Sequence, residues 1–429
     1  MNIVALCIIL LLMFFLKSSL PASLANPLQS SSLALGFIML FAFLAGKNIN
    51  RLKLPQITGF ILAGILGGPF LLKLLSVAEV KNLQLLDGLA LSLIALTAGG
   101  EMEIARLRKN VKGIMSIVIF QTVVIVSGFV AFGFVGRSFF PLFRDKSSVE
   151  ILSIALLFGT LATATSPSTT IAIITETKAK GKYTNLILSS AVVKDFLVII
   201  LFAFALSFSR SFLSPEEAFN INFLKDILLE VGMSLVMGLA VGAGIIFYLK
   251  YIKREVTIFI LSIAFFTYQI SQTIGLHSLL VCLLAGFLVK NFSLYGEKFI
   301  LAIERSSLPV YVVFFAISGA SIDLNALEKS WWLALIFVVW RGGLKFLGTF
   351  AGGKIAREDS LVNRQSWAGF ISQAGVALGM AIIIENTFPV WGGEFKALIL
   401  AVIGLNQIVG PVLLQKFLLK TGETGQKVV

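Results

Sequence analysis

The chain has 429 residues, of which 57% are hydrophobic and only 13% are charged. Because a soluble domain carries about 25% charged residues, this composition excludes a soluble globular protein, a disordered chain and a disulfide scaffold. The net charge of +13 does not require nucleic acid, since basic loops beside an anionic membrane surface explain the same surplus. Cys7, Cys282 and the single His277 form no metal or catalytic motif, so we expect no metal centre, no cofactor and no enzyme.

Long apolar stretches indicate an all-α polytopic membrane protein. A helix needs about 20 mostly apolar residues to cross the hydrocarbon layer of a bilayer. On this criterion we expect about thirteen transmembrane helices, near residues 31–46, 55–75, 85–98, 112–136, 150–175, 185–208, 227–249, 256–274, 276–289, 308–323, 331–352, 366–385 and 396–418.

The N-terminal segment has two interpretations. Its first 16 residues are another apolar run, which ends at Lys17. Ser23 and Ala25 suit a signal-peptide cleavage site, although no Lys or Arg precedes the run. Residues 1–25 are therefore either a removed signal peptide or an extra N-terminal helix. We expect the transmembrane domain over residues 26–420 and a short tail over 421–429.

The distribution of Lys and Arg predicts the orientation in the membrane. Most of the 35 basic residues lie in alternate loops, near residues 47–53, 106–112, 178–182, 250–254, 290–305, 354–364 and 416–427. Cytoplasmic loops carry the excess of positive charge. We therefore expect an inner (plasma) membrane protein in contact with lipid, with its C-terminus in the cytoplasm.

A polar run interrupts the stretch at 150–175. Residues 163–170 read Thr-Ala-Thr-Ser-Pro-Ser-Thr-Thr, and Pro167 removes a backbone donor and disfavours a helix at Ser166. Freed carbonyls and half-helix ends in such a break hold ions in transporters. We expect Thr165, Ser166 and Thr169 to line an ion site; a simple proline kink at a helix contact is the alternative.

Two charged residues lie together inside the stretch at 185–208. Lys194 and Asp195 are about ten residues from its start, too deep to reach water easily. Adjacent helical residues point about 100° apart, so the two side chains face different partners. We expect Asp195 to bind a cation and a proton in turn, or else to form a structural ion pair.

Two bases share one face of the stretch at 331–352. Arg341 and Lys345 are four residues apart, and Arg341 needs an anionic or carbonyl partner at its depth. We expect Arg341, Lys345 and Lys194 to compensate charge, with Asp195 as the candidate partner of Arg341. A positively charged anchor at the membrane edge is the alternative.

A second polar interruption lies in the next-to-last stretch, at Gln373 and Gly375. Matched interruptions in two halves of a chain point to a transporter site. Pro167 and Asp195 fall in spans four to six, whereas Arg341 and Gln373 fall in spans eleven to thirteen. This spacing predicts two inverted repeats.

Five segments resemble the sodium/hydrogen exchanger superfamily, and most of all its monovalent cation:proton antiporters of the second cation:proton antiporter family, which include the Kef-type membrane domains. Residues 54–69 match its LP-x-x-x-G-[YF]-x-x-AG-x-x-x-GP opening, and four further segments follow in the family's order: 96–101, 164–167, 309–323 and 373–379.

The resemblance implies a sodium/proton antiporter fold with two crossed, broken helices. It implies core helices at about 112–208 and 331–418, dimerisation helices at about 31–98 and 256–323, and a homodimer. Asp195 matches the family carboxylate and Arg341 the family base. One difference is Lys194, because the family has Asp or Asn before the carboxylate.

From these observations we expect an antiporter that exchanges Na⁺ or K⁺ for protons by alternating access. Asp195, Thr165, Ser166, Thr169 and Gln373 would bind the ion or the proton. Two alternatives remain open on the sequence: a transporter of another solute, such as an anion, and a non-transporting membrane scaffold. No nucleic-acid partner is expected.

Overall fold

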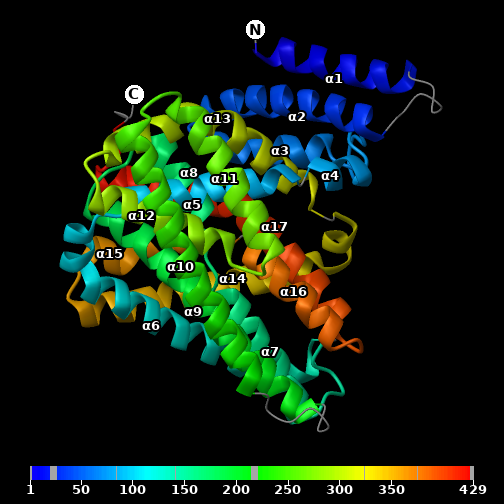
Figure 1. Cartoon of the computed structure of the whole chain (residues 1–429). Coiled ribbons are helices and arrows are strands. Elements are labelled where there is room, and N and C mark those ends of the chain that lie inside the picture. The colour runs from blue at the N-terminus through cyan, green and yellow to red at the C-terminus, as the bar shows by residue number, and fades with distance from the viewer. Residues whose placement is uncertain are drawn as a thin grey trace. The chain divides into compact units, whose positions relative to one another are not determined.

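The computed structural model describes residues 2–19, 27–83, 85–140, 142–213, 221–322, 324–373 and 375–425. Four sequence-based assignments fall wholly or partly outside these residues: the cleavage site at Ser23–Ala25, the motif end at Asp323, Ala374 in the second interruption, and residues 426–429 of the tail. The residues that are described form α-helices and short 3₁₀ helices, and no β-strand occurs among them (Figure 1). The predicted all-α class is confirmed.

Each of the thirteen predicted stretches overlaps a helix, but fewer helices are long enough to span a bilayer alone. Among the described residues eight helices are long and apolar enough, or up to ten when two bent helix pairs each count as one span. Two further apolar helices are shorter, at Gln56–Gly67 and Ser278–Phe292. The difference arises because chain breaks and bends divide several apolar stretches into pieces.

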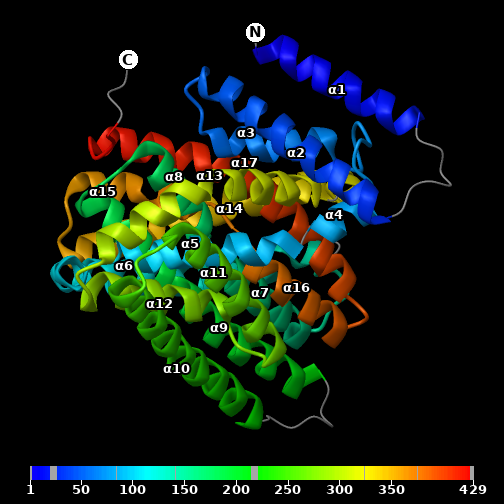
Figure 2. The ribbon, with the colours of Figure 1, turned by 45° about the horizontal axis from the view of Figure 1, so that its top comes forward.

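The helices group into two compact units. Unit 1 comprises Met1–Glu103, Ile171–Thr177 and Ser234–Asn325. Its complete helices are α1 (Asn2–Ser19), α2 (Pro27–Asn50), α3 (Gln56–Gly67), α4 (Val77–Leu83), α5 (Leu85–Glu101), α11 (Val256–Thr273), α12 (Ser278–Phe292) and α13 (Gly296–Ala320). In both ribbon views α1, α2 and α3 follow one another as neighbours (Figures 1 and 2).

Unit 1 is held together by helices whose backbones approach very closely. A Cβ atom on Gly64 of α3 would lie 1.9 Å from the carbonyl oxygen of Ala316 in α13. A Cβ on Gly99 of α5 would lie 1.9 Å from the carbonyl oxygen of Leu283 in α12. Only glycine permits these approaches, because any other side chain would have to occupy the position of a backbone atom.

Unit 2 comprises Ile104–Thr170, Lys178–Met233 and Ala326–Val429. It contains α6 (Ile104–Val135), η2 (Gly136–Ser138), α7 (Ser148–Thr163), α9 (Lys182–Leu213), most of α14 (Leu324–Ala356), α15 (Ser360–Gln365), η3 (Ser366–Phe370), α16 (Gly375–Thr387) and α17 (Gly392–Thr421). Both α8 (Pro167–Thr177) and α10 (Ile221–Tyr251) are divided between the units.

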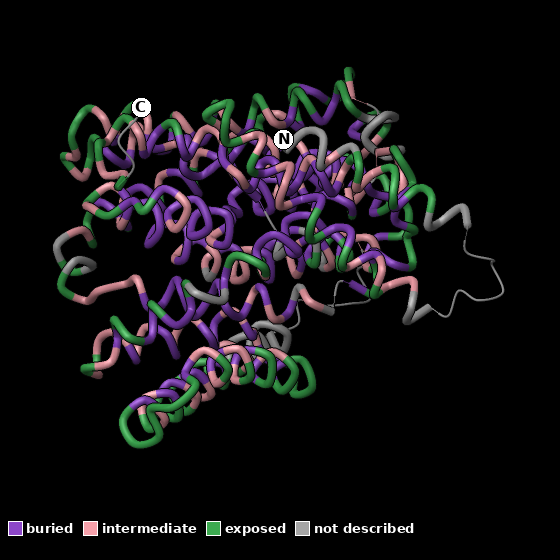
Figure 3. Tube along the Cα trace, turned by 90° about the horizontal axis from the view of Figure 1, so that it is seen from above, coloured by how far each residue is buried: buried purple, intermediate pink, exposed green. Residues whose placement is uncertain are grey.

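The core of unit 2 is rich in aromatic side chains. The rings of Phe129, Phe158 and Phe337 pack in stacked, tilted and edge-on pairs, with centroid separations of 4.9–6.4 Å. Along the trace, buried stretches are purple and exposed ones green (Figure 3). This packed apolar body surrounds a smaller set of buried polar residues, which form the candidate site.

Candidate functional site

The first helix break lies between α7 and α8. A capping box of Ser147 and Glu150 begins α7, and the helix ends at Thr163. Ala164 has φ −52° and ψ 142°, so the chain leaves the helix there. Ser166 then caps α8, since its hydroxyl accepts a hydrogen bond from the amide of Thr169 at 3.1 Å. Pro167 starts α8 at a position where no backbone donor is needed. The predicted interruption is present.

The second break lies between η3 and α16. Helix η3 ends at Phe370, residues 371–373 are not helical, and α16 begins at Gly375. The two breaks lie against each other. The amide of Ser166 donates to the carbonyl oxygen of Ser372 at 2.9 Å, and the Thr165 hydroxyl donates to the carbonyl oxygen of Phe370 at 3.3 Å. We call this contact of the two breaks the crossing.

Arg341 binds backbone carbonyls at the crossing. From α14 it donates to Ala162 at 2.8 Å, to Ala164 at 2.7 Å and to Ile371 at 2.7 Å. The expected pairing of Arg341 with Asp195 is absent from the structure. The physical reason is that the breaks free carbonyls at the negative end of α7, and the planar guanidinium can bind several of them at once.

Lys345 lies one turn further along α14 and donates hydrogen bonds to the same end of α7. Its Nζ is 3.0 Å from the Thr165 hydroxyl oxygen, 3.3 Å from the carbonyl oxygen of Ala164 and 3.5 Å from that of Thr163. Thr165 and its neighbouring carbonyls, expected to be ligands of a transported ion, therefore bind a cation that belongs to the protein. A role of Thr165, Ser166 and Thr169 in ion binding stays a prediction.

Lys194 has partners on two other elements. Its Nζ donates to the side-chain oxygen of Gln121 in α6 and lies 3.9 Å from the ring centroid of Phe370. The Gln121 side-chain nitrogen donates to the Thr349 hydroxyl and, at 3.4 Å, to the carbonyl oxygen of Lys345. These acceptors on α14 fix the amide so that its oxygen faces Lys194.

Asp195 follows Lys194 in α9. It is half-buried in the middle of α9, and no hydrogen bond or ion pair joins it to another described residue. The carboxylate of Asp195 is therefore not neutralised by Lys194 or Arg341, and its neighbour Lys194 contacts Phe370, the residue that precedes the second break.

Gln373 joins the two breaks through its side chain. Its Nε2 donates to the carbonyl oxygen of Leu161 in α7 at 2.9 Å. Its Oε1 accepts from the side-chain nitrogen of Asn406 in α17 at 2.8 Å. Gln373, predicted as an ion ligand, is thus part of an amide pair at the crossing; Gly375 begins α16 there, as expected of a break residue.

Sequence reasoning missed Gln121, Thr349 and Asn406, each of which is 0% exposed. A search for ionisable residues at membrane depth passes over neutral amides and hydroxyls. Gln121 and Asn406 nevertheless lie in long apolar stretches, and a buried amide requires hydrogen-bond partners as a buried charge does. That requirement is the signal that could have found them.

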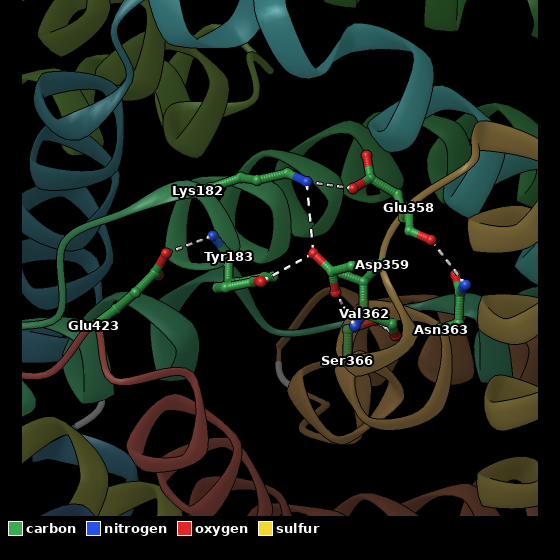
Figure 4. A network of polar contacts seen from close by, with 8 residues as sticks. All are labelled: Lys182, Tyr183, Glu358, Asp359, Val362, Asn363, Ser366 and Glu423. Atoms are coloured by element: carbon green, nitrogen blue, oxygen red, sulfur yellow. Dashed lines mark hydrogen bonds and ion pairs between the residues drawn. The ribbon is translucent and has the colours of Figure 1, made fainter.

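A second polar network fixes the start of α9 (Figure 4). Gly181 has no side-chain acceptor for the first amides of α9, and Glu423 supplies one, accepting from Tyr183 at 2.8 Å and Thr184 at 2.7 Å. A Cβ on Gly181 would lie 2.1 Å from Glu423, so glycine leaves room for this cap. The segment after α17 thus anchors the helix that carries Asp195.

The same end of α9 is tied to the loop before α15. Lys182 lies 2.7 Å from the Glu358 carboxylate and 3.7 Å from that of Asp359, and the Tyr183 hydroxyl donates to Asp359 at 2.9 Å (Figure 4). Burial alone would raise the pKa of Asp359. Hydrogen bonds from Val362 and Tyr183 and attraction to Lys182 outweigh burial and hold this pKa below its ordinary value.

Comparison with known proteins identifies the fold and the family. The family model described as sodium/hydrogen exchanger, transmembrane, matches residues 36–420. The chain belongs to the sodium/hydrogen exchanger family. This is a family of secondary transporters, so the chain is a multi-pass membrane protein.

Curated relatives of this family member cover nearly the whole chain. The Na⁺/H⁺-K⁺ antiporter GerN of Bacillus cereus is 24% identical over 387 residues, covering 89% of this chain and 95% of the relative. A Na⁺/H⁺ antiporter of Enterococcus hirae is 24% identical over 394 residues, covering 89% and 96%.

The solved structure of the sodium/proton antiporter MjNhaP1 from Methanocaldococcus jannaschii is similar in fold. It has a TM-score of 0.67 and 17% identity, and the match covers 94% of this chain and 100% of that protein. At this identity the similarity concerns the fold alone. The predicted sodium/proton antiporter fold is confirmed.

Proposed function

We propose that this protein exchanges a monovalent cation, Na⁺ or K⁺, for protons by alternating access. The observation that carries the proposal is Asp195, a half-buried carboxylate without a hydrogen bond or ion pair to any described residue. It directly follows Lys194, which contacts Phe370 at the second of the two crossing helix breaks. An uncompensated carboxylate at membrane depth is costly and is a functional residue by default. The names of the relatives, Na⁺/H⁺ and Na⁺/H⁺-K⁺ antiporters, support the same function.

In this mechanism Asp195 carries either the cation or the proton. A proton and a monovalent cation each bring one positive charge to the carboxylate. The net charge of the site is therefore the same when it carries the cation one way and the proton the other. Arg341 and Lys345 compensate the exposed carbonyls of the breaks, so that the crossing keeps its geometry while Asp195 changes occupant. No metal cofactor or enzymatic step is needed.

The buried bases favour a cation over an anionic solute. Arg341, Lys345 and Lys194 are each occupied by carbonyl, hydroxyl or amide oxygens of the protein. An anion would have to displace these oxygens and leave backbone carbonyls unsatisfied, which is unfavourable in a buried site.

We also propose the roles of the two units and the orientation. Unit 2, which contains the crossing and Asp195, would be the moving core, whereas unit 1, with its close helix contacts, would form a homodimer interface. The excess of Lys and Arg in alternate loops favours a cytoplasmic C-terminus in an inner membrane containing anionic lipid. Cysteine crosslinking of the unit 1 surface in membranes tests the dimer.

The proposal is tested in proteoliposomes with a pH-sensitive dye and a membrane-potential dye. We expect Na⁺ or K⁺ to drive proton flux in the wild type and Asp195→Asn to abolish it. Glu394→Gln, an exposed acid in the first turn of α17, is the matched control and should retain flux. Cation-driven flux that persists in Asp195→Asn rules out this role. Anion-driven flux supports the anion transporter, and no flux at all supports the scaffold.

A further inference from the structure

Two kinds of nitrogen-bearing side chain lie at the crossing. Arg341 and Lys345 are positively charged, and their donors are bound to oxygens of the breaks. Gln373 and Asn406 are neutral amides from the second break and from α17. A cation is repelled by the first kind, and the carbonyls there are already occupied. Of these two kinds, only the amides have a side-chain oxygen to offer a cation.

The orientation of both amides is determined by a chain of donors and acceptors. Because Gln373 faces the carbonyl oxygen of Leu161, it must present its nitrogen there and its oxygen to Asn406. Asn406 must in turn present its nitrogen to Gln373. The oxygen Oδ1 of Asn406 is thereby directed away from Gln373 and cannot exchange places with the nitrogen.

The face of α17 that carries Asn406 is packed firmly on the second break. One turn later, a Cβ on Gly410 would lie 2.7 Å from the backbone nitrogen of Ser372, so the helix and the break are in backbone contact. Ser372 accepts the hydrogen bond from Ser166 of the first break. Asn406 is therefore held at a fixed position relative to the crossing.

The oxygen of Asn406 is buried and lacks a hydrogen-bond partner. The residue is 0% exposed, and within the described part of the chain nothing donates to its Oδ1. An apolar residue would avoid the cost of this unpaired acceptor. An amide oxygen is a hard ligand of the kind that binds cations without d-electron preferences.

We propose that Oδ1 of Asn406 is a further ligand of the transported monovalent cation, and that Gln373 positions it. This inference rests on the proposed cation exchange. It adds to the carboxylate of Asp195 a neutral ligand from α17. The ligand is available because its own nitrogen is held by Gln373, which is held by the end of α7.

The experiment compares Asn406→Leu with Asn406→Asp in proteoliposomes, with NaCl and KCl as the probes. Asn406→Leu removes the oxygen, and we expect the half-saturating cation concentration to rise about tenfold while the maximal rate stays within about twofold. Asn406→Asp keeps an oxygen at this position but loses the donor to Gln373. We expect its half-saturating concentration to stay within about threefold of the wild type.

Gln415→Leu is the matched control, a buried amide about two turns further along the same helix, and it should leave the half-saturating concentration unchanged. Because Asn406→Leu risks misfolding, Asn406→Ala and the rise in Tm of the purified protein on addition of NaCl provide a second measurement. Na⁺ should stabilise the wild type and Gln415→Leu but not the Asn406→Leu or Asn406→Ala variants.

Three outcomes are distinguishable. Unchanged half-saturation in Asn406→Leu, or an equal rise in Asn406→Asp and Asn406→Leu, overturns the ligand role while the proposed function stands. Absence of cation-driven flux in the wild type, or its persistence in Asp195→Asn, overturns the proposed function and this inference with it. A rise confined to the Leu and Ala variants supports the inference.

Discussion

Units 1 and 2 hold their helices together by different means. In unit 1, Gly64 and Gly99 let helix backbones meet directly, with no side chain between them. In unit 2, Arg341, Lys345 and Gln373 bind the freed backbone carbonyls of the two breaks. The α9 and α17 side chains Lys194 and Asn406 in turn bind side-chain amides. Close backbone contacts hold helices rigidly together. Polar side chains at membrane depth instead satisfy the hydrogen bonds of irregular backbone, and ion sites of transporters are built at such irregular backbone.

The largest expected effect comes from removing the polar contacts of unit 2 at Arg341. Arg341→Leu leaves the carbonyls of Ala162, Ala164 and Ile371 without their donor. We expect a loss of about 3–5 kcal/mol in the free energy of unfolding, measured by thermal unfolding in detergent. Arg341→Lys should recover only part of this stability, because one ammonium group cannot reproduce the several donors of the planar guanidinium.

Gly342→Ala is the matched control for Arg341, because a Cβ there meets nothing within 4 Å. We expect it to be neutral or slightly stabilising. If Arg341→Leu were as stable as this control, the polar contacts would not be what holds the crossing.

The close helix contacts of unit 1 are tested at Gly64. Gly64→Ala places a Cβ against the Ala316 carbonyl and should separate α3 from α13, costing about 1–3 kcal/mol. Gly244→Ala, with open space around its Cβ, should cost nothing. The melting temperatures of the two variants are compared by thermal unfolding. Equal melting temperatures would mean that the close approach of α3 and α13 contributes nothing to stability.

Gln121 tests how far the polar network extends from the crossing. Gln121→Met removes the acceptor of Lys194 and should cost about 1–2 kcal/mol. In a Lys194→Met background the same change should cost much less, because the buried ammonium that needs the acceptor is gone. A double-mutant cycle of unfolding midpoints measures this coupling. Additive losses would show that Gln121 acts independently of Lys194.

The smallest effect is expected at the water-exposed end of α9. Because the pKa of Asp359 is lower in the folded protein than its ordinary value of 3.8, its contribution is complete above that value and is lost as the pH falls through the folded pKa. At pH 7 Asp359→Asn should cost under about 1 kcal/mol, since the pair with Lys182 is partly exposed.

The measurement for Asp359 is the unfolding midpoint of the wild type and Asp359→Asn across acid pH. Their difference should be constant near neutral pH and shrink below about pH 4. A difference that persisted in acid would mean that the asparagine disrupts packing and that the carboxylate charge is unimportant.

Much of the site could be predicted from residue type and depth. Pro167 and the polar residues around it indicated the first break, because proline cannot continue the hydrogen bonding of a helix. Arg341, Lys345 and Asp195 were found because charge in an apolar stretch is costly. The prediction that Arg341 pairs with Asp195 was wrong, because the guanidinium instead binds the carbonyls of Ala162, Ala164 and Ile371. The sequence does not show that the helix breaks bring these acceptors to Arg341.

By itself the sequence determined the all-α membrane class, the positions of the apolar stretches and the resemblance to sodium/hydrogen exchangers. These properties depend on local composition and on motifs that are continuous in the chain. Only the tertiary structure decided that Gln373 joins Leu161 to Asn406, that Gln121 holds Lys194, and that Glu423 caps α9. Each of these contacts joins residues far apart in sequence. A buried polar group must be satisfied, but its partner depends on how the helices pack.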